Sequence, residues 1–173
     1  MGGSLADLFS SIVLHRQGHN VTILERSPTP LLQHQGAGVV AGGETQAFFS
    51  KHDRTRRPIA VTSQQRLYLN QKGDIVDKED TVQHMTSWDL LYYLGRANFD
   101  QVKNNYLPAG EAPEKSNIEG TAHYEYGRIV RAAKEVGGKV DVVYEDVRPP
   151  KEDGGLPNEG SGHGATYLCP IHK

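Results

Sequence analysis

The stretch from residue 2 to residue 26 constrains the fold of this chain more than any other. Two glycines, Gly2 and Gly3, precede a segment with helical spacing of apolar residues, and a short apolar run, Val21–Glu25, ends in an acid. The acid follows the glycines by about twenty residues, as in a βαβ unit that binds a dinucleotide through a tight glycine turn and a ribose-binding carboxylate. Because Met1 directly precedes the glycines, we expect the first strand of the unit to be absent. The order of elements therefore predicts an incomplete Rossmann-like unit.

The segment between the glycines and the strand has the pattern of an amphipathic helix. The residues expected to face the core fall at i, i+3, i+4, i+7 and i+8, and they are Leu5, Leu8, Phe9, Ile12 and Val13. The residues expected to face away from the core are Ser10, Ser11, His15 and Arg16. We expect Gly18 to end the helix, because glycine readily adopts the left-handed conformation that terminates helices.

The glycine turn carries only part of the chemistry that binds a pyrophosphate. Backbone N–H groups at a helix start point toward phosphates, and the glycines of the motif permit their close approach. Gly2 stands at the first glycine position, Ser4 at the second and Asp7 at the third. A carboxylate about 5 Å from a phosphate repels it by a few kcal/mol at an effective dielectric constant of ~20. The sequence therefore favours the helix, whose first turn benefits from an acid, more than its anionic ligand.

Several segments together carry a family resemblance. They are GGSLA at residues 2–6, GHNVTILER at 18–26, GAGV at 36–39, Arg57-Pro58, and MTSWDLLYYL at 85–94. These segments resemble the amino-terminal FAD-binding segment of the flavoprotein aromatic hydroxylases, and within that family the proteins similar to 2,6-dihydroxypyridine 3-monooxygenase and salicylate hydroxylase. The resemblance covers residues 2–148.

The resemblance implies a cofactor, a co-substrate and a substrate class. It implies FAD as the cofactor, NAD(P)H as its reductant, and a small aromatic or N-heteroaromatic ring as the group that is hydroxylated. The residues assigned to the cofactor are Gly2, Gly3, Ser4, Glu25, Arg26 and Gly38. Many members have an arginine near the start of the helix that follows residue 86, in contact with the cofactor phosphates, whereas this chain has Ser87. For Trp88 we expect packing on the core rather than contact with the flavin. No catalytic residue is predicted.

The remaining patterns predict helices and β-hairpins. After a loop over residues 27–40, we expect a helix from Gly43 or Glu44 to His52, with Phe48 and Phe49 against the core, and another over 86–99 with a cap at Thr86 or Ser87. A hairpin is expected over residues 59–77, and a second one from Tyr124 to Glu145 that reverses at Gly137-Gly138. Residues 131–136 are equally compatible with a helix by propensity. The predicted fold class is therefore α/β, an incomplete Rossmann-like FAD-binding domain with β-hairpin insertions.

Two parts of the chain differ in character. Residues 1–148 form the partial FAD-binding domain, and residues 149–173 are rich in glycine, proline and polar residues, which predicts a disordered tail. In the tail, Gly160, Gly162 and Gly164 only superficially resemble a phosphate loop, since no strand precedes them. The metal-binding residue types of the tail, His163, Cys169 and His172, lack tetrahedral ligand spacing, so no metal site is predicted.

Composition limits the partners and the compartment. The net charge is −2, which gives no electrostatic reason to expect nucleic acid or an anionic membrane as a partner. Cys169 is the only cysteine, and no apolar run reaches the length of a membrane span, so we expect a cytoplasmic protein. The mean hydropathy of −0.57 predicts a marginal core.

Three functional interpretations remain open. The first is the FAD-binding portion of an NAD(P)H-dependent aromatic-ring monooxygenase, truncated and inactive alone. The second is a fragment of an NAD-binding oxidoreductase, since Glu25 suits the ribose of NAD and would repel the 2′-phosphate of NADP. The third is a non-catalytic remnant that binds nothing or serves as an interaction surface. An FAD or NAD titration of the purified chain distinguishes them.

Overall fold

A computed structural model of the chain shows a mixed α/β fold, which confirms the predicted class at that level. It describes residues 2–29, 36–107 and 118–148, together with Leu32, Pro113 and Ser116. The proposed tail from residue 149 onward, with its glycines, histidines and cysteine, lies outside the described residues. In the described part, three helices accompany a parallel strand pair, a three-stranded antiparallel sheet and a separate antiparallel hairpin.

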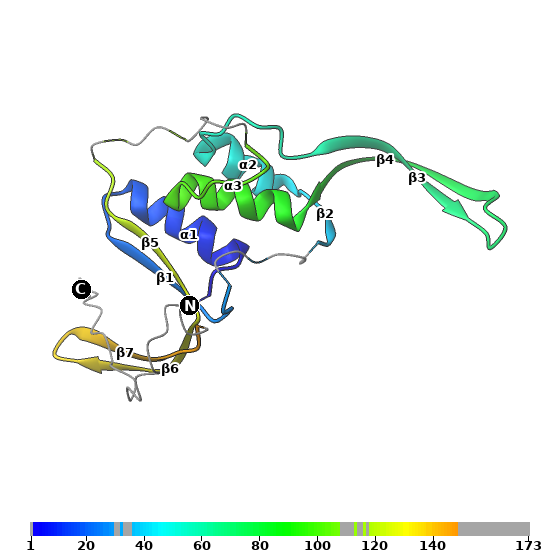
Figure 1. Ribbon diagram of the computed structural model, residues 1–173. Helices are drawn as coiled ribbons and strands as arrows, with labels where there is room; N and C mark the ends of the chain where they lie inside the picture. Colours follow the sequence, from blue (N-terminus) through cyan, green and yellow to red (C-terminus); the bar gives the residue numbers. More distant parts are fainter. Residues whose placement is uncertain are drawn as a thin grey trace.

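The parallel pair carries two helices on the same face. Strand β1 (Val21–Glu25) pairs in parallel with β5 (Ala122–Tyr126), and Ile23 lies opposite Tyr124. Helix α1 (Leu5–Arg16) contacts β1, and helix α3 (Trp88–Asp100) contacts β5 and lies beside α1. Figure 1 shows the two helices next to this sheet. Their shared core consists of Leu8, Ile12, Ile23, Tyr92 and Phe99.

Helix α2 (Gly43–His52) packs on the other side of the helix pair. Its Phe49 is buried and forms a second core cluster with Leu91 and Leu94 of α3, while Phe48 stacks on Phe9 of α1 at 4.2 Å between ring centroids. The predicted helix and the inward direction of both phenylalanines are confirmed. Because α1 is covered by β1, α3 and α2, it is enclosed on more than one side.

Two hairpins extend from this body. Strand β4 (Ile75–Ser87) pairs with β3 (Val61–Leu69) on one edge and with the short β2 (Gly38–Val40) on the other, so β4 runs ten residues beyond the predicted end of the hairpin at residue 77. Strands β6 (Arg128–Val136) and β7 (Lys139–Asp146) form the second hairpin, which confirms the strand alternative for residues 131–136. This hairpin begins at Arg128 and not, as predicted, at Tyr124, because Tyr124 belongs to β5 and pairs with β1. Figure 1 shows β3 and β4 projecting away from the helices.

Other details of the structure correct the sequence-based expectations. Ser11 and His15, expected to face away from the core, are 7% and 4% exposed, because α1 is covered by neighbours on several faces. Ser87, rather than Thr86, caps α3 by accepting a hydrogen bond from the N–H of Leu90 at 3.1 Å. Gly18 follows α1 with a φ of +91°, as predicted for the residue that ends this helix. No helix of the described part is long and apolar enough to cross a membrane.

Candidate functional site

The predicted glycine turn and the predicted acid meet in the folded chain. The N–H of Gly3 donates to Oε2 of Glu25 at 2.6 Å, across 22 positions of sequence. The other carboxylate oxygen, Oε1, accepts from the N–H of Ser27 at 2.7 Å. Glu25 is 7% exposed, so this carboxylate is a fixed and largely buried link between the start of α1 and the end of β1. The sequence places the acid at the strand end, and the structure shows that it holds the turn.

The carbonyl side of Gly3 is held by a chain of three side chains. Nη1 of Arg96 donates to the Tyr92 hydroxyl at 2.8 Å, the Tyr92 hydroxyl donates to the Tyr124 hydroxyl at 3.3 Å, and the latter donates to the Gly3 carbonyl oxygen at 3.3 Å. A Cβ at position 3 would lie 1.8 Å from the Tyr124 hydroxyl oxygen. Only glycine fits at this position, because the space of a side chain is filled by Tyr124.

Arg96 anchors this chain of hydrogen bonds from inside the fold. Its guanidinium pairs with Asp100 at 2.8 Å and stacks on the Tyr124 ring at 3.5 Å from the centroid. Burial lowers the pKa of Arg96, but its hydrogen bonds and charge pairing with Asp100 outweigh that effect and raise the pKa overall. Burial, with the hydrogen bond to Tyr92, raises the pKa of Tyr124. Tyr124 is therefore a neutral hydroxyl donor at physiological pH.

The amino ends of two helices lie on the side of the glycine turn. Arg16 at the end of α1 donates to the side chain of Asn98 near the end of α3 at 3.0 Å, and Leu8 in the middle of α1 lies 3.5 Å from the Cβ position of Gly95. The two helices consequently run in the same direction. A helix start carries a partial positive charge and unsatisfied N–H groups, so this side of the molecule has two features that attract anions.

The second glycine segment lies at the start of α3 rather than at the turn. The Trp88 N–H donates to the Ala37 carbonyl oxygen at 3.0 Å, and Gly38 pairs with Ser87 in the sheet. A Cβ at Gly36 would lie 3.6 Å from Oδ2 of Asp89, and Oδ1 of the same carboxylate is buried with no hydrogen-bond partner among the described residues. None of the described residues lies within 4 Å of a Cβ at Gly38, so packing in that part of the chain does not explain this glycine.

Apart from Arg26, the predicted cofactor residues thus fall into two groups. Gly3 and Glu25 are hydrogen-bonded, and Gly2 and Ser4 flank Gly3 in the same turn, whereas Gly38 stands with the start of α3. Ser4 is exposed at the start of α1, and its side chain makes no capping hydrogen bond. The side chain of Arg26 is exposed immediately after Glu25 and has no ion pair in the described part of the chain.

Asp7 places a second carboxylate at the turn. Its Oδ2 lies 3.0 Å from the Cβ position of Gly2. Together with Glu25, it gives the turn two acidic neighbours, which opposes the attraction of the helix start for an anion. The structure therefore agrees with the electrostatic conflict that the sequence predicts.

Tyr92, Arg96 and Tyr124 were not among the predicted site residues. One signal was available, because Arg96 falls among the apolar residues of a strongly amphipathic helix, where a charged residue needs a buried partner. That Tyr124 lies over Gly3 depends on the parallel pairing of β1 with β5, which no local pattern specifies. Trp88 stacks on Tyr92 at 4.9 Å and packs against the core, as expected.

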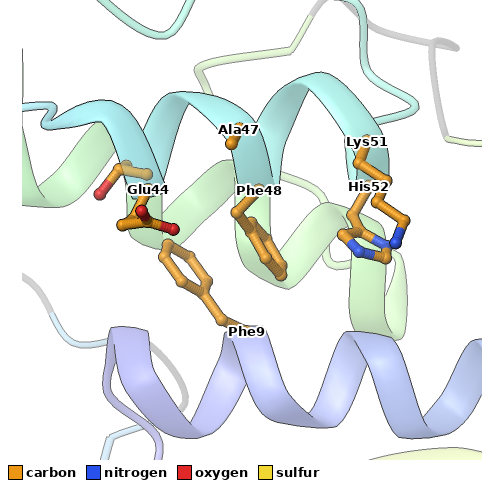
Figure 2. A pocket seen from close by; sticks show the side chains of 7 residues that line it. Phe9, Glu44, Ala47, Phe48, Lys51 and His52 are labelled. Carbon is orange, nitrogen blue, oxygen red and sulfur yellow. The ribbon is translucent and has the colours of Figure 1, made fainter.

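Two surface hollows lie apart from the turn. One, of about 410 Å³, lies beside α2 and Phe9 of α1, and Figure 2 shows the rings of Phe9 and Phe48 next to each other in its lining. Glu44, Thr45, Ala47, Lys51 and His52 complete its lining. The other, of about 560 Å³, lies beside α2 and the loop that follows it, and Arg56 and Arg57 contribute to its wall. Neither is lined by a residue of the glycine turn.

Comparison with known structures identifies the fold. The chain is similar to 2,6-dihydroxypyridine-3-hydroxylase from Arthrobacter nicotinovorans, with a TM-score of 0.60 and 20% identity over 84% of this chain and 32% of that one. It is also similar to FqzB, with a TM-score of 0.58, 16% identity, and coverage of 85% and 31%. A third is p-nitrophenol 4-monooxygenase PnpA from Pseudomonas putida DLL-E4, with a TM-score of 0.52, 15% identity, and coverage of 83% and 34%.

These likenesses define a class by fold. The chain has part of the fold found in aromatic-ring hydroxylases and monooxygenases, which confirms the resemblance predicted from the sequence. It spans about a third of the length of these structures. No model of a known protein family matches the sequence, and no curated protein does.

Proposed function

We propose that this chain is the FAD-binding portion of an NAD(P)H-dependent flavoprotein monooxygenase that hydroxylates an aromatic or N-heteroaromatic ring. The observation that carries the proposal is the hydrogen bond from the Gly3 amide to the Glu25 carboxylate, which joins a glycine turn at a helix start to an acid at the end of a parallel strand. Support comes from the fold likeness to a dihydroxypyridine hydroxylase and a nitrophenol monooxygenase.

Glu25 is suited to bind the ribose of the cofactor. Each of its oxygens already accepts one backbone N–H, from Gly3 and from Ser27, which fixes the carboxylate without using all of its lone pairs. A ribose diol could donate to the remaining lone pairs with little loss of side-chain entropy, because the acceptor is held in place. This part of the site fits a dinucleotide.

The phosphate part of the site fits less well. The exposed hydroxyl of Ser4 and the starts of α1 and α3 favour a pyrophosphate, whereas the Asp7 carboxylate beside Gly2 opposes it. We therefore expect the chain to bind FAD weakly. FAD supplies the redox chemistry when bound, and the described residues of this chain supply its binding and orientation. We expect no hydroxylation by this chain alone.

The test is an FAD titration of the purified chain, followed by quenching of flavin fluorescence, in the wild type and two variants. Asp7→Asn removes the opposing charge at nearly constant size, so we expect binding to tighten by about tenfold or more at low salt, with a smaller gain at high salt. Glu25→Ala should abolish binding. Glu44→Gln is the matched control, since it removes an acid from the start of a different helix, α2, away from the glycine turn.

The outcomes separate the three interpretations. Micromolar FAD binding that responds to Asp7 and Glu25 but not to Glu44 supports the proposal. Binding of NAD⁺ in preference to FAD would instead favour an NAD-dependent oxidoreductase. If neither nucleotide binds the wild type or Asp7→Asn while circular dichroism shows a folded chain, the proposal is wrong.

A further inference from the structure

The β3–β4 hairpin exposes most of the large apolar side chains on the described surface. Eight of the thirteen exposed large hydrophobic residues of the described part lie on these two strands. They are Val61, Leu67, Tyr68, Leu69, Ile75, Val76, Val82 and Met85. The hairpin projects from the helical body, and its outer part contacts no other element of the described part of the chain (Figure 1). A projecting ribbon with this much apolar surface is typical of an interaction site.

Strand β3 forms the open edge of this ribbon. The strand order β2-β4-β3 places it outermost in its sheet within the described part of the chain. Its nine residues, VTSQQRLYL, contain a single charge, at Arg66, and no proline. Charged residues, prolines and bulges are the features that usually prevent an edge strand from pairing with another chain. Strand β3 has almost none of these protections.

Strand β4, unlike β3, has many charged residues and contains the bulges of the hairpin. Four consecutive charged residues, Asp77 to Asp80, lie along it. Both irregularities of the hairpin place the extra residue in β4, where Thr81 and Val82 oppose Gln64 alone and Val76 has no counterpart. The bulges therefore leave β3 with a regular alternation along its outer edge. The projecting ribbon has one edge along β3 and one along β4, and only the β3 edge is suited to pair with another strand.

We propose that β3 pairs in antiparallel register with β3 of a second copy of this chain, so that two hairpins form one four-stranded sheet around a two-fold axis. The inference is independent of FAD binding. A register centred on Gln65 places Arg66 opposite Gln64 of the partner subunit, so no like charges meet. It also places Val61 opposite the partner's Leu69 and Thr62 opposite the partner's Tyr68, and such β-branched and aromatic pairs stabilise antiparallel sheets.

Two alternative pairings are less favourable. Centring the axis on Arg66 would set two guanidinium groups directly opposite each other, which destabilises a sheet. Pairing of β3 with β4 of the partner would bring the edge against a strand with four charges and two bulges. Arg66 also already pairs with Glu79 across its own hairpin at 3.3 Å, so it does not require an acid from a partner. Self-pairing about Gln65 keeps like charges apart and pairs all nine residues of β3, from Val61 to Leu69.

The test is sedimentation velocity of the full chain at concentrations from about 1 to 300 μM, because a small interface of one strand per subunit predicts weak association. Gln64→Arg places like charges opposite each other twice per dimer and should weaken association roughly 2- to 30-fold. Gln64→Glu creates two opposite-charge pairs and should strengthen it by a similar factor. Gln64 is exposed, so neither variant disturbs the monomer.

Gln71→Arg and Gln71→Glu make the same charge changes in the turn between β3 and β4, and both should associate like the wild type. Opposite shifts for the two Gln64 variants, with both effects reduced in 1 M salt where screening is strong, support the proposal. A chain that stays monomeric up to the highest concentration, or a dimer that responds equally to both Gln64 variants, would overturn it.

Discussion

The backbone of Gly3 lies so close to Tyr124 that a Cβ at position 3 would be 1.8 Å from the hydroxyl oxygen and 2.5 Å from Cζ. These residues are 121 positions apart, and the Tyr124 hydroxyl also donates to the Gly3 carbonyl oxygen. The same glycine donates its N–H to Glu25. Both backbone polar groups of Gly3 are therefore hydrogen-bonded, the N–H to Glu25 and the carbonyl to Tyr124. Packing against Tyr124 requires a glycine here, in addition to any role of the residue toward a ligand.

Gly3→Ala should destabilise the fold by about 1–3 kcal/mol, because the added methyl group forces Tyr124 out of its place. The φ of Gly3 lies outside the left-handed region, so backbone strain does not contribute. Gly43→Ala is the matched control, since no atom of the described residues lies within 4 Å of its Cβ position at the first residue of α2. The control should be neutral or more stable by up to about 1 kcal/mol. Urea denaturation of both variants measures the difference, and equal stabilities would contradict the packing argument.

Arg96→Lys should lower the free energy of unfolding by about 2–3 kcal/mol. Lysine cannot reproduce the paired contact with Asp100, the hydrogen bond to Tyr92 and the stacking on Tyr124 at once, and its charge would remain buried. Arg131→Lys is the control, because Arg131 pairs with Glu145 on an exposed hairpin where both side chains are more than half exposed. Its effect should stay within about 0.5 kcal/mol. Denaturation curves with the two variants side by side provide the measurement.

Glu25→Gln should destabilise the chain by about 1–3 kcal/mol. A glutamine side chain has only one oxygen, so it can accept from either Gly3 or Ser27 and turns its NH₂ group toward the other N–H. Glu79→Gln on the exposed face of β4 makes the same chemical change and should have little effect. If the two variants unfold at the same urea concentration, the buried carboxylate does not hold the turn.

Local patterns predicted the elements of this fold well where the determinants are short-range. Gly18 ends α1 because a glycine with positive φ is needed there, and the reversal at Gly137-Gly138 likewise uses two glycines with positive φ. The end of β4 could not be predicted in this way. That strand continues to Ser87 because β2, some fifty positions earlier, pairs with its last residues.

Long-range packing also explains what the sequence left undetermined at the site. The distance of about twenty residues placed Glu25 and the glycines in one unit, but it gave no indication that the carboxylate would accept the Gly3 N–H. His15 and Ser11 were expected to face away from the core because they are polar, and they are buried because α1 has neighbours on several faces. Arg96 is the informative exception, since a charge among apolar positions indicates a buried partner without identifying Tyr92 or Tyr124.

The ion pair between Arg54 and Glu119 should make stability depend on pH in the acid range. Burial raises the pKa of Glu119, but the hydrogen bond from the Ser116 N–H and the ion pair with Arg54 outweigh burial and lower the pKa below its usual value of 4.5. The unfolded chain therefore binds this proton more readily than the folded one. The stabilisation is fully present above pH 4.5 and is lost as the pH falls through the lower pKa of the folded state.

Glu119→Gln removes this titration, and its effect separates the pair from other acids that titrate in the same range. At pH 7 the variant should be less stable by about 1 kcal/mol, a modest value because solvent screens the partly exposed Arg54. As the pH falls from 5 toward 3, the difference in unfolding free energy between wild type and variant should shrink. Other groups with lowered pKa, such as Asp146 at about 2, contribute equally to both proteins and cancel in that difference. If the difference in unfolding free energy between wild type and Glu119→Gln stays constant from pH 7 to pH 3, the lowered pKa of Glu119 is not coupled to folding.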